Sequence, residues 1–582
     1  MKTRFFAFSA ACLLVLGSCG HRLRDGEHVL TVLSTNDVHG SWFDSTYTGS
    51  GIRRSLFAVK YCVDSVRTAD GAGNVLLVDA GDCLQGDNAA YYYNYVDTLS
   101  PHLFPRLMKY MGYDAIAWGN HDVETGHAVY DRVQRDLVKA GIPFLAANAV
   151  RDDNGKPYFP AYKMVDKAGL RIAVLGYQNA NINAWLSEEL WKGMHFERIA
   201  GRIQQDVDAV RRKEHPDVVV AIIHSATGEG DGTNAESEAL DVFNSVRGVD
   251  WVICAHDHRP YTETRDSTAL INSGSHTRYL GYGKMHVKVE KGAIVEKTFE
   301  TRLIPIKAAL VDTLMRARFR PEFEAVRDFT LQEVGVLNVD LRTREAYKGM
   351  SPYINLLHTI CLAQEPAQIS IAAPLTYNRD IAAGVLRFND LFTIYPFENQ
   401  LFVISMSGTE LVQYLEASYD RWIQTVRRPG EHVLKIVPRN DARTQQKGWS
   451  FVNRAYNFDS AAGINYTVDV TKPRGERVTV LSMADGSAFE ESRTFNVAMT
   501  SYRASGGGGL LDEIGIDTDD IGRRVVARYP EIRNLLYEYL LENGSIDPEV
   551  ISDPAVIGSW RFVPEKLAVP ALRADLALLF GD

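Results

Sequence analysis

Short apolar runs alternate with amphipathic stretches through the first half of the chain. The runs have the length and composition of buried strands, and the stretches between them place apolar residues at helical spacing. The predicted strands are 28–35, 74–80, 113–118, 170–177, 217–223 and 249–254. Helices alternating with strands predict layered α/β packing with a substantial parallel component. Residues 284–289 and 294–298 are typical of a hairpin, so we expect the sheet to be mixed.

The pattern changes after residue 305. Residues 306–339 begin with a charged stretch in helical rhythm that Pro321 interrupts, which predicts linker helices between two domains. Shorter strands and helices then predict a second, α+β domain over 340–542, with its last helix at 524–541. Residues 543–582 contain several prolines and end in an apolar stretch, and the sequence assigns this tail no role.

The first 19 residues have the features of an export signal. Lys2 and Arg4 precede an apolar run at 5–16 that is too short to span a bilayer, and residues 16–19 read Leu-Gly-Ser-Cys. This tetrapeptide resembles a bacterial lipobox, which implies lipidation at Cys19. An ordinary secretory signal is the alternative. Both predict an exported chain, and the lipoprotein form would contact the membrane only through its lipid anchor.

The length of the chain indicates more than one domain, and its charge limits the kinds of ligand it can bind. A chain of 582 residues exceeds what one hydrophobic core supports. A net charge of -10 and a pI near 5.9 argue against binding a nucleic-acid polymer, while a small anionic substrate remains possible. The four cysteines after Cys19 form no CxxC pair, so neither a zinc ribbon nor a dense disulfide framework is indicated. We predict no protein partner.

Polar residues gather where the predicted strands of the first half end. A single histidine at such a position is more often structural than a ligand. Here five loops offer carboxylate, amide or imidazole groups, the donor set that first-row divalent metals accept. A carboxylate can bridge two ions, which makes Asp82 a candidate shared ligand. The residues concerned are Asp37, His39, Asp82, Asn120, His121, His224, His256 and His258.

The ordered motifs of the first half resemble those of the calcineurin-like metallophosphoesterases. The motifs are DVHG at 37–40, GDCLQGD at 81–87, GNHD at 119–122, the strand that ends at His224, and AHDH at 255–258, where Ala255 replaces a glycine. The resemblance implies a four-layer α/β/β/α sandwich. It also implies two divalent metal ions, one held by Asp37, His39, Asp82 and His258 and the other by Asp82, Asn120, His224 and His256. Their identity stays open among Mn, Zn, Fe and Co.

The expected chemistry is hydrolysis of a phosphoester. Two cations neutralise the phosphate and convert a bound water to hydroxide, which attacks phosphorus in line. We expect catalysis to involve Asn120, His121 and Glu124. His121 would stabilise or protonate oxygen as the ester bond breaks, and Glu124 would orient its imidazole. Asp122 is expected only to cap the helix that follows.

Motifs of the second half resemble the C-terminal domain of the 5'-nucleotidase branch. They are AGVLRFNDLF at 383–392, YPFEN at 395–399, GTEL at 408–411 and FDSAAGINY at 458–466. The resemblance implies that Phe458 and Tyr502 sandwich a nucleobase. The branch's NGGGIR-like stretch is missing, and Arg379 or Arg387 is a candidate replacement for its arginine. A run of glycines at 506–509 stands where the branch has GGDG, whose aspartate approaches the ribose.

Three functions remain open from the sequence. The favoured one is hydrolysis of nucleoside 5'-monophosphates, with 2',3'-cyclic nucleotides or nucleotide sugars as further substrates. The second keeps the dinuclear site but acts on a non-nucleotide phosphoester, or on a sulfur-linked substrate as in the related thiosulfohydrolases. The third is a noncatalytic surface protein that binds nucleotides. A hydrolysis panel and a metal analysis distinguish them.

Overall fold

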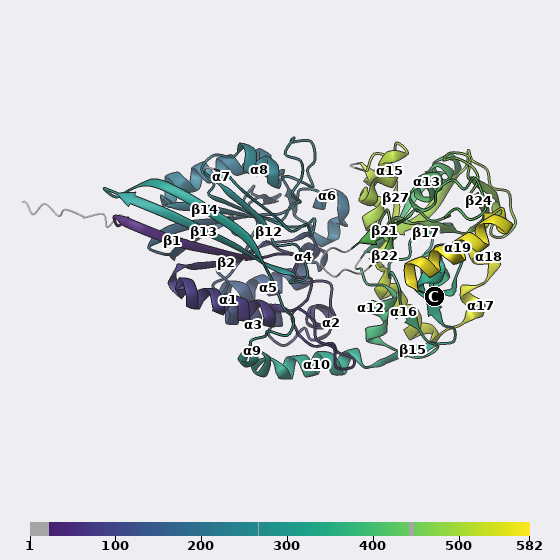
Figure 1. Cartoon of the computed structure of the whole chain (residues 1–582), viewed down its shortest axis with the longest axis horizontal. Coiled ribbons are helices and arrows are strands. Elements are labelled where there is room, and N and C mark those ends of the chain that lie inside the picture. Colours follow the sequence, from purple (N-terminus) through teal and green to yellow (C-terminus); the bar gives the residue numbers. More distant parts are fainter. Residues whose placement is uncertain (1–22, 266, 398, 441–446, 519, 582) are drawn as a thin grey trace, which may run out of the picture.

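Two domains lie side by side along the long axis of the molecule, joined by a pair of helices (Figure 1). The computed structural model describes residues 23–581, except 266, 398, 441–446 and 519. The expected signal segment 1–19, with Cys19, lies outside this part of the chain. Within the described part, no helix combines the length and apolarity needed to cross a membrane.

The first domain contains two six-stranded mixed sheets. The first has the order β14-β13-β1-β2-β3-β4, and the second β11-β12-β10-β9-β7-β6. Strands of the first sheet are β1 (Gly26–Thr35), β2 (Val75–Asp79), β3 (Ala115–Ala117), β4 (Phe144–Leu145), β13 (Tyr279–Glu290) and β14 (Ala293–Pro305). Strands of the second are β6 (Tyr162–Lys167), β7 (Leu170–Tyr177), β9 (Val218–Ile223), β10 (Trp251–Cys254), β11 (Tyr261–Thr264) and β12 (Ala269–Asn272). The predicted hairpin is β13 and β14, which pair antiparallel.

The sheets pack face to face, and helices cover their outer faces. Side chains such as Leu30, Val220 and Ile253 form the core between the sheets. Helices α1 (Leu56–Asp70), α3 (Leu103–Met111) and α5 (His127–Ala140) cover the first sheet, and α7 (Ile199–Glu214) and α8 (Ala239–Ser245) the second. Strands buried on both faces explain the continuous apolar runs in the sequence. The predicted four-layer α/β/β/α sandwich is confirmed.

The linker is shorter than its predicted span of 306–339. It consists of α9 (Thr313–Arg318) and α10 (Arg320–Thr330), with Pro321 in the first turn of α10, where it costs no hydrogen bond. Strand β15 (Glu333–Leu337) already belongs to the second domain, because it pairs with β19 (Gly384–Arg387) and β28 (Ser545–Ile546).

The second domain is built on a five-stranded sheet of order β23-β17-β26-β20-β27. Its strands are β17 (Ile369–Ala372), β20 (Gln400–Ser407), β23 (Ser460–Ala462), β26 (Thr494–Thr500) and β27 (Val525–Glu531). Two apolar clusters flank it, one with α11 (Pro352–Leu362), α12 (Phe388–Ile394) and α16 (Ile532–Asn543), the other with α13 (Gly408–Trp422). The helix predicted at 524–541 is wrong in its first part, because β27 pairs there with β20.

Residues 543–582 were expected to form a separate tail, and the structure corrects this: as far as residue 581 they are part of the second domain. Besides β28, they contain α17 (Pro548–Ile551), α18 (Pro554–Ile557), β29 (Gly558–Val563) and α19 (Glu565–Phe580). Strand β29 pairs in parallel with β24 (Ile464–Asp469), so a strand from each side of the predicted boundary forms one ladder. In α19 the carboxylate of Asp575 accepts the backbone N–H groups of Val433 and Leu434, each at 2.8 Å.

Candidate metal centre and substrate cavity

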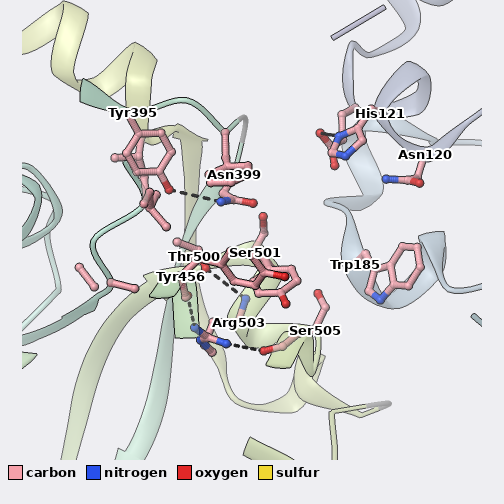
Figure 2. A pocket seen from close by; sticks show the side chains of 18 of the residues that line it. Asn120, His121, Trp185, Tyr395, Asn399, Tyr456, Thr500, Ser501, Arg503 and Ser505 are labelled. Carbon is pink, nitrogen blue, oxygen red and sulfur yellow. Dashed lines mark hydrogen bonds and ion pairs between the residues drawn. The ribbon is translucent and has the colours of Figure 1, made fainter. Parts of the chain in front are cut away.

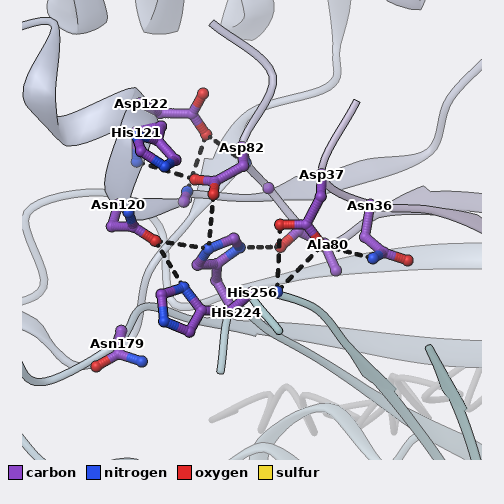
Figure 3. A network of polar contacts seen from close by, with 12 residues as sticks. Asn36, Asp37, Ala80, Asp82, Asn120, His121, Asp122, Asn179, His224 and His256 are labelled. Atoms are coloured by element: carbon purple, nitrogen blue, oxygen red, sulfur yellow. Dashed lines mark hydrogen bonds and ion pairs between the residues drawn. The ribbon is translucent and has the colours of Figure 1, made fainter. Parts of the chain in front are cut away.

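Five strand ends of the first domain meet at one edge of the two sheets. Asp37 and His39 follow β1, Asp82 follows β2, and Asn120 follows β3. His224 follows β9, and His256 and His258 follow β10. Ligands bind at the carboxyl ends of strands in such folds, and the structure brings together all seven residues predicted to hold metal. Figure 3 shows Asp37, Asp82, Asn120, His224 and His256 among them.

The backbone is strained at this edge. Asp37, His39, Asp82, His256 and His258 all have φ between +46° and +78°, and they are five of the ten non-glycine residues with positive φ in the described part of the chain. Such conformations cost about 1–3 kcal/mol each and persist where the surroundings impose them, frequently at functional sites. The strain therefore separates these residues from ordinary loop residues.

Four lone-pair donors surround one point near Asn120. Its Oδ1 lies 2.9 Å from Nε2 of His224 and 2.9 Å from Nδ1 of His256. Nε2 of His224 is also 3.2 Å from the Asp82 carboxylate. Nδ1 of His224 donates to the carbonyl oxygen of Ala80 at 2.8 Å, so its neutral ring presents a lone pair at Nε2. Lone pairs that face one another in this way repel unless a cation lies between them, so this group is suited to binding a metal ion.

A second group lies on the other side of Asp82. Nε2 of His39 and Nε2 of His258 are 2.9 Å apart, and Nε2 of His258 is 3.6 Å from the carboxylate of Asp37. Ligand atoms of Asp37, His39 and His258 lie within 4.8 Å of one another, as do those of His39, Asp82 and His121. His121, which we did not expect to be a ligand, is thus close enough to bind an ion.

Burial and neighbouring charges shift the pKa values of the Asp and His residues in this centre. Burial alone would lower the pKa of His224, but the Asp82 carboxylate outweighs burial and raises it to about 9. Burial also raises the pKa of Asp37 to about 7, and it lowers the pKa of His258 to about 4. A proton on His224 thus offsets the charge of Asp82. A divalent cation offers the same compensation, so these Asp and His residues fit a metallophosphoesterase metal site.

His121 and Glu124 form the expected pair. Nδ1 of His121 lies 2.9 Å from Oε2 of Glu124, one helical turn further along α4 (Asn120–Glu124). The backbone N–H of His121 donates to Asp82 at 2.9 Å, which fixes the start of this helix against the centre. The imidazole therefore faces the cavity at a set position beside the metal-binding residues (Figure 2).

Asp122 does more than cap its helix. It accepts the N–H of Gly119, as an N-terminal cap does, and also the N–H groups of Asp82, Cys83 and Leu84. Gly119 permits this close approach, because a Cβ there would lie 2.2 Å from the backbone N of Asp82. The motif GNHD therefore ties the Asn120 loop to the Asp82 loop.

A cavity of about 430 Å³ lies between the two domains and reaches this centre. The first domain contributes Asp82, Asn120, His121, Trp185 and His256 among others. The second domain contributes the aromatic residues Phe397, Tyr456 and Tyr502 and the polar residues Asn399, Thr500, Ser501, Arg503 and Ser505. Figure 2 shows Tyr456, Asn399 and Arg503 across the cavity from His121 and Trp185. Apolar lining residues of the second domain are Leu357, Cys361, Ile371, Ala372, Ala373, Leu375 and Ile532.

The predicted substrate-binding residues are only partly at this cavity. Tyr502 lines it, but Phe458 is fully buried in the core of the second domain and stacks on Trp422 at 5.6 Å. Arg379 and Arg387 are exposed and lie outside the cavity lining. Arg387 is the N-cap residue before α12, and the backbone N–H of Arg379 donates to the Thr343 hydroxyl. Their predicted contact with the phosphate has no support in this geometry.

Several residues at the site carried no recognised signal in the sequence. Tyr456 lines the cavity two positions before Phe458, just outside the motif recognised at 458–466. Trp185 comes from the short helix α6 (Ile182–Trp185) and Glu236 from a loop, and neither belongs to a recognised motif. Asn36 donates to Asp37 at 2.6 Å, and its position beside DVHG was the one available hint.

Fold and site together define a class of protein: a phosphoester hydrolase with a metallophosphoesterase-like first domain. The model for the 5'-nucleotidase C-terminal domain matches residues 333–513, and a model for the bacterial capsule synthesis protein PGA_cap matches 45–269. The second domain thus matches the 5'-nucleotidase C-terminal domain family, and the chain as a whole is similar to 5'-nucleotidases and 2',3'-cyclic-nucleotide phosphodiesterases.

Curated relatives match most of the chain at low identity. A 2',3'-cyclic-nucleotide 2'-phosphodiesterase/3'-nucleotidase of Haemophilus influenzae is 25% identical over 97% of this chain and 92% of its own length. A 5'-nucleotidase of Vibrio vulnificus is 24% identical over 71% of this chain and 81% of its own. The trifunctional nucleotide phosphoesterase YfkN of Bacillus subtilis is 24% identical over 92% of this chain, which spans 39% of that longer protein.

Solved structures share the two-domain fold. A putative 5'-nucleotidase from Staphylococcus aureus, in complex with alpha-ketoglutarate, superposes with a TM-score of 0.72 at 20% identity, covering 92% of this chain and 99% of the other. The sulfate thiohydrolase SoxB from Thermus thermophilus gives a TM-score of 0.54 at 18% identity, covering 92% and 97%. At these identities the likeness concerns the fold.

Proposed function

We propose that the chain is an exported two-metal phosphoesterase that releases phosphate from nucleoside 5'-monophosphates. One observation carries the proposal: a single cavity joins the group of metal-binding residues in the first domain to an aromatic wall in the second. A nucleotide has phosphate at one end and an aromatic base at the other, and this cavity offers a partner for each. The favoured ions are Mn, Zn, Fe or Co.

The chain's own residues divide the work. Asp37, His39, Asp82 and His258 would hold one ion, and Asp82, Asn120, His224 and His256 the other. Bound divalent ions neutralise the phosphate charge and activate water at neutral pH. His121, whose Nδ1 is held by Glu124, stabilises or protonates the leaving oxygen.

The base-binding role passes from Phe458 to Tyr456. Tyr456 and Tyr502 both line the cavity, with ring centroids 6.3 Å apart and nearly perpendicular. Arg503 donates to the backbone oxygen of Tyr456 at 2.9 Å, and its guanidinium is paired with Asp459. Stacking on an aromatic side chain contributes about 1–3 kcal/mol per base. We place the base against these tyrosines and the sugar near Ser501 and Asn399.

The charge of the cavity favours a second candidate, a 2',3'-cyclic nucleotide. Arg503 is the single arginine or lysine among the lining residues, and it donates to Asp459, Asn457 and backbone oxygens rather than facing an anion. A cyclic phosphodiester carries one negative charge, whereas a monoester carries nearly two at neutral pH. A cavity with few cationic side chains suits the diester. The name of the Haemophilus relative also includes a 2',3'-cyclic nucleotide as a substrate. Nucleotide sugars, with two phosphates, fit this charge less well.

A hydrolysis panel tests the proposal. Purified protein, loaded in turn with Mn²⁺, Zn²⁺, Fe²⁺ and Co²⁺, is assayed with AMP, 2',3'-cyclic AMP, UDP-glucose, a non-nucleotide phosphoester and a thiosulfonate-type ester. We expect metal-dependent turnover of AMP or the cyclic nucleotide. Turnover confined to the non-nucleotide or sulfur-linked substrates would replace the nucleotide assignment, and no turnover despite bound metal would favour a noncatalytic nucleotide-binding role.

We propose that export ends in a lipid anchor at Cys19. The Leu-Gly-Ser-Cys sequence at 16–19 supports this, since the thiol follows a short apolar segment with basic residues before it. Labelling cells with a radioactive fatty acid is expected to mark the wild type and not Cys19→Ala. Equal labelling of both would refute lipidation at Cys19, and retention of the Cys19→Ala protein outside the cytoplasm would leave export itself intact.

A further inference from the structure

The loop between His224 and α8 folds back over the metal centre. Its residue Glu236 has a backbone oxygen that accepts three hydrogen bonds, from Ser225 Oγ at 2.8 Å and from Ala226 N and Asn179 Nδ2 at 3.0 Å. The N–H of Glu236 donates to Asn234 at 2.8 Å. These contacts fix the position of Glu236, although its side chain is partly exposed.

The side chain of Glu236 contacts the outer edge of His256. Its Oε1 lies 3.0 Å from Nε2 of His256, while Nδ1 of the same ring lies 2.9 Å from Asn120 Oδ1. An ionised carboxylate only accepts hydrogen bonds, so the proton of a neutral imidazole sits on Nε2. The lone pair of Nδ1 is then directed at the group of donors formed by Asn120, Asp82 and His224.

The face of the same imidazole is covered by Trp185. The rings stack at 5.2 Å with an interplanar angle of 12°, and Trp185 ends α6 (Ile182–Trp185), which comes from a different loop. Figure 2 shows Trp185 on the first-domain side of the cavity, opposite Tyr456. His256 is thus restrained at its edge and across its face.

We propose that Glu236 and Trp185 are positioning residues that set the affinity of the Asn120–His224–His256 group for a divalent cation. Neither touches the donors of that group other than His256. Glu236 selects the tautomer that can bind an ion and increases the basicity of the ring, and Trp185 prevents the ring from turning. Partners of this kind typically change metal affinity 10- to 100-fold. The inference rests on the metal binding proposed above.

Manganese binding to the purified full chain tests Glu236. Calorimetric titration of the metal-stripped protein with MnCl₂ is expected to show two sites in the wild type. In Glu236→Ala one of them weakens by about 10- to 100-fold and the other stays within about twofold. Glu229→Ala is the matched control, since it removes an exposed carboxylate from the same loop and should leave both sites unchanged. Circular dichroism of the metal-free variants monitors folding.

Three further variants separate positioning from bulk charge. Glu236→Gln keeps an oxygen that accepts from Nε2 and should recover part of the affinity, and Trp185→Phe should retain more than Trp185→Ala. Equal affinities for Glu236→Ala and Glu229→Ala would overturn the inference and leave the proposed function standing. A wild type that binds manganese normally but hydrolyses no phosphoester would overturn the proposed function and leave the inference about Glu236 and Trp185 standing. A wild type that binds no divalent ion would overturn both.

Discussion

Asp122 holds Asp82 in place through the backbone: its carboxylate accepts the N–H of Asp82 at 3.1 Å and the next two N–H groups of that loop at 2.8 Å each. The same carboxylate accepts the N–H of Gly119 at 2.9 Å. Burial and the neighbouring Asp82 raise the pKa of Asp122 to about 6. One buried side chain therefore joins the loop that carries the shared carboxylate to the loop that carries Asn120 and His121.

Replacing Asp122 by Ala is expected to weaken metal binding at both groups, because Asp82 belongs to both. Each buried N–H left without a partner costs about 1–3 kcal/mol, so the thermal midpoint should also fall. Manganese titration and a melting curve measure the two effects. Asp131→Ala, which removes a carboxylate from α5, is the control. Wild-type manganese affinity in Asp122→Ala would contradict this account of the loop.

His121→Asn is expected to lower kcat by about 10²- to 10⁴-fold, because proton transfer to the leaving oxygen contributes that much in comparable enzymes. Glu124→Gln should have a smaller effect, since it changes only the hydrogen bond at Nδ1. Steady-state kinetics on the best substrate of the panel measures both, and metal analysis confirms that the ions stay bound. Unchanged kcat in His121→Asn would remove the proposed role.

Tyr502→Ala and Tyr456→Ala are expected to raise KM for a nucleotide about 5- to 150-fold, the equivalent of about 1–3 kcal/mol of stacking. Phe458→Ala should instead lower the free energy of unfolding by about 3–5 kcal/mol, because its ring lies in the core against Trp422. Nucleotide kinetics and denaturant unfolding separate the two outcomes. A raised KM in Phe458→Ala without loss of stability would restore the original assignment.

His358 is expected to make the second domain sensitive to acid. The ring is buried between the hydroxyls of Ser370 and Ser460, and burial lowers its pKa to about 3. Above pH 6.5 it is neutral both folded and unfolded. As the pH falls below 6.5 the unfolded chain takes up a proton that the folded chain refuses, so stability decreases, by about 2 kcal/mol at pH 5.

His358→Gln should remove this part of the pH dependence. Thermal midpoints of the metal-free proteins at pH 7.5 and pH 5 provide the measurement, and the drop between them should be smaller in the variant. Removing metal with a chelator keeps the ligand histidines from contributing through ion release. The same drop in both proteins would show that His358 does not couple folding to protons.

The sequence by itself determined the layered fold of the first domain and which seven residues are candidates for holding metal. The spacing of apolar residues and the composition of a segment are local properties of the sequence. Strands buried on both faces must be continuously apolar, so β2 and β9 could be recognised without knowing which strands pair with them. The polar residues that follow such strands converge because the carboxyl ends of these strands, from both sheets, lie at the same side of the sandwich. The pairing of His121 with Glu124 follows from a spacing of three residues on one helix.

Tertiary structure decided what depends on partners distant in the chain. Whether Tyr456 or Phe458 faces the cavity depends on how the segment packs against Trp422, which the order of two nearby aromatic residues cannot reveal. Residues 525–531 form β27 because β20 offers a ladder there, although their local pattern favoured a helix. Strand β29 pairs with β24 across about 90 residues, and Glu236 reaches His256 from a loop without a motif. Local patterns indicate whether a segment is a helix or a strand and which of its residues are polar. Contacts between segments distant in the chain decide which side chains lie together.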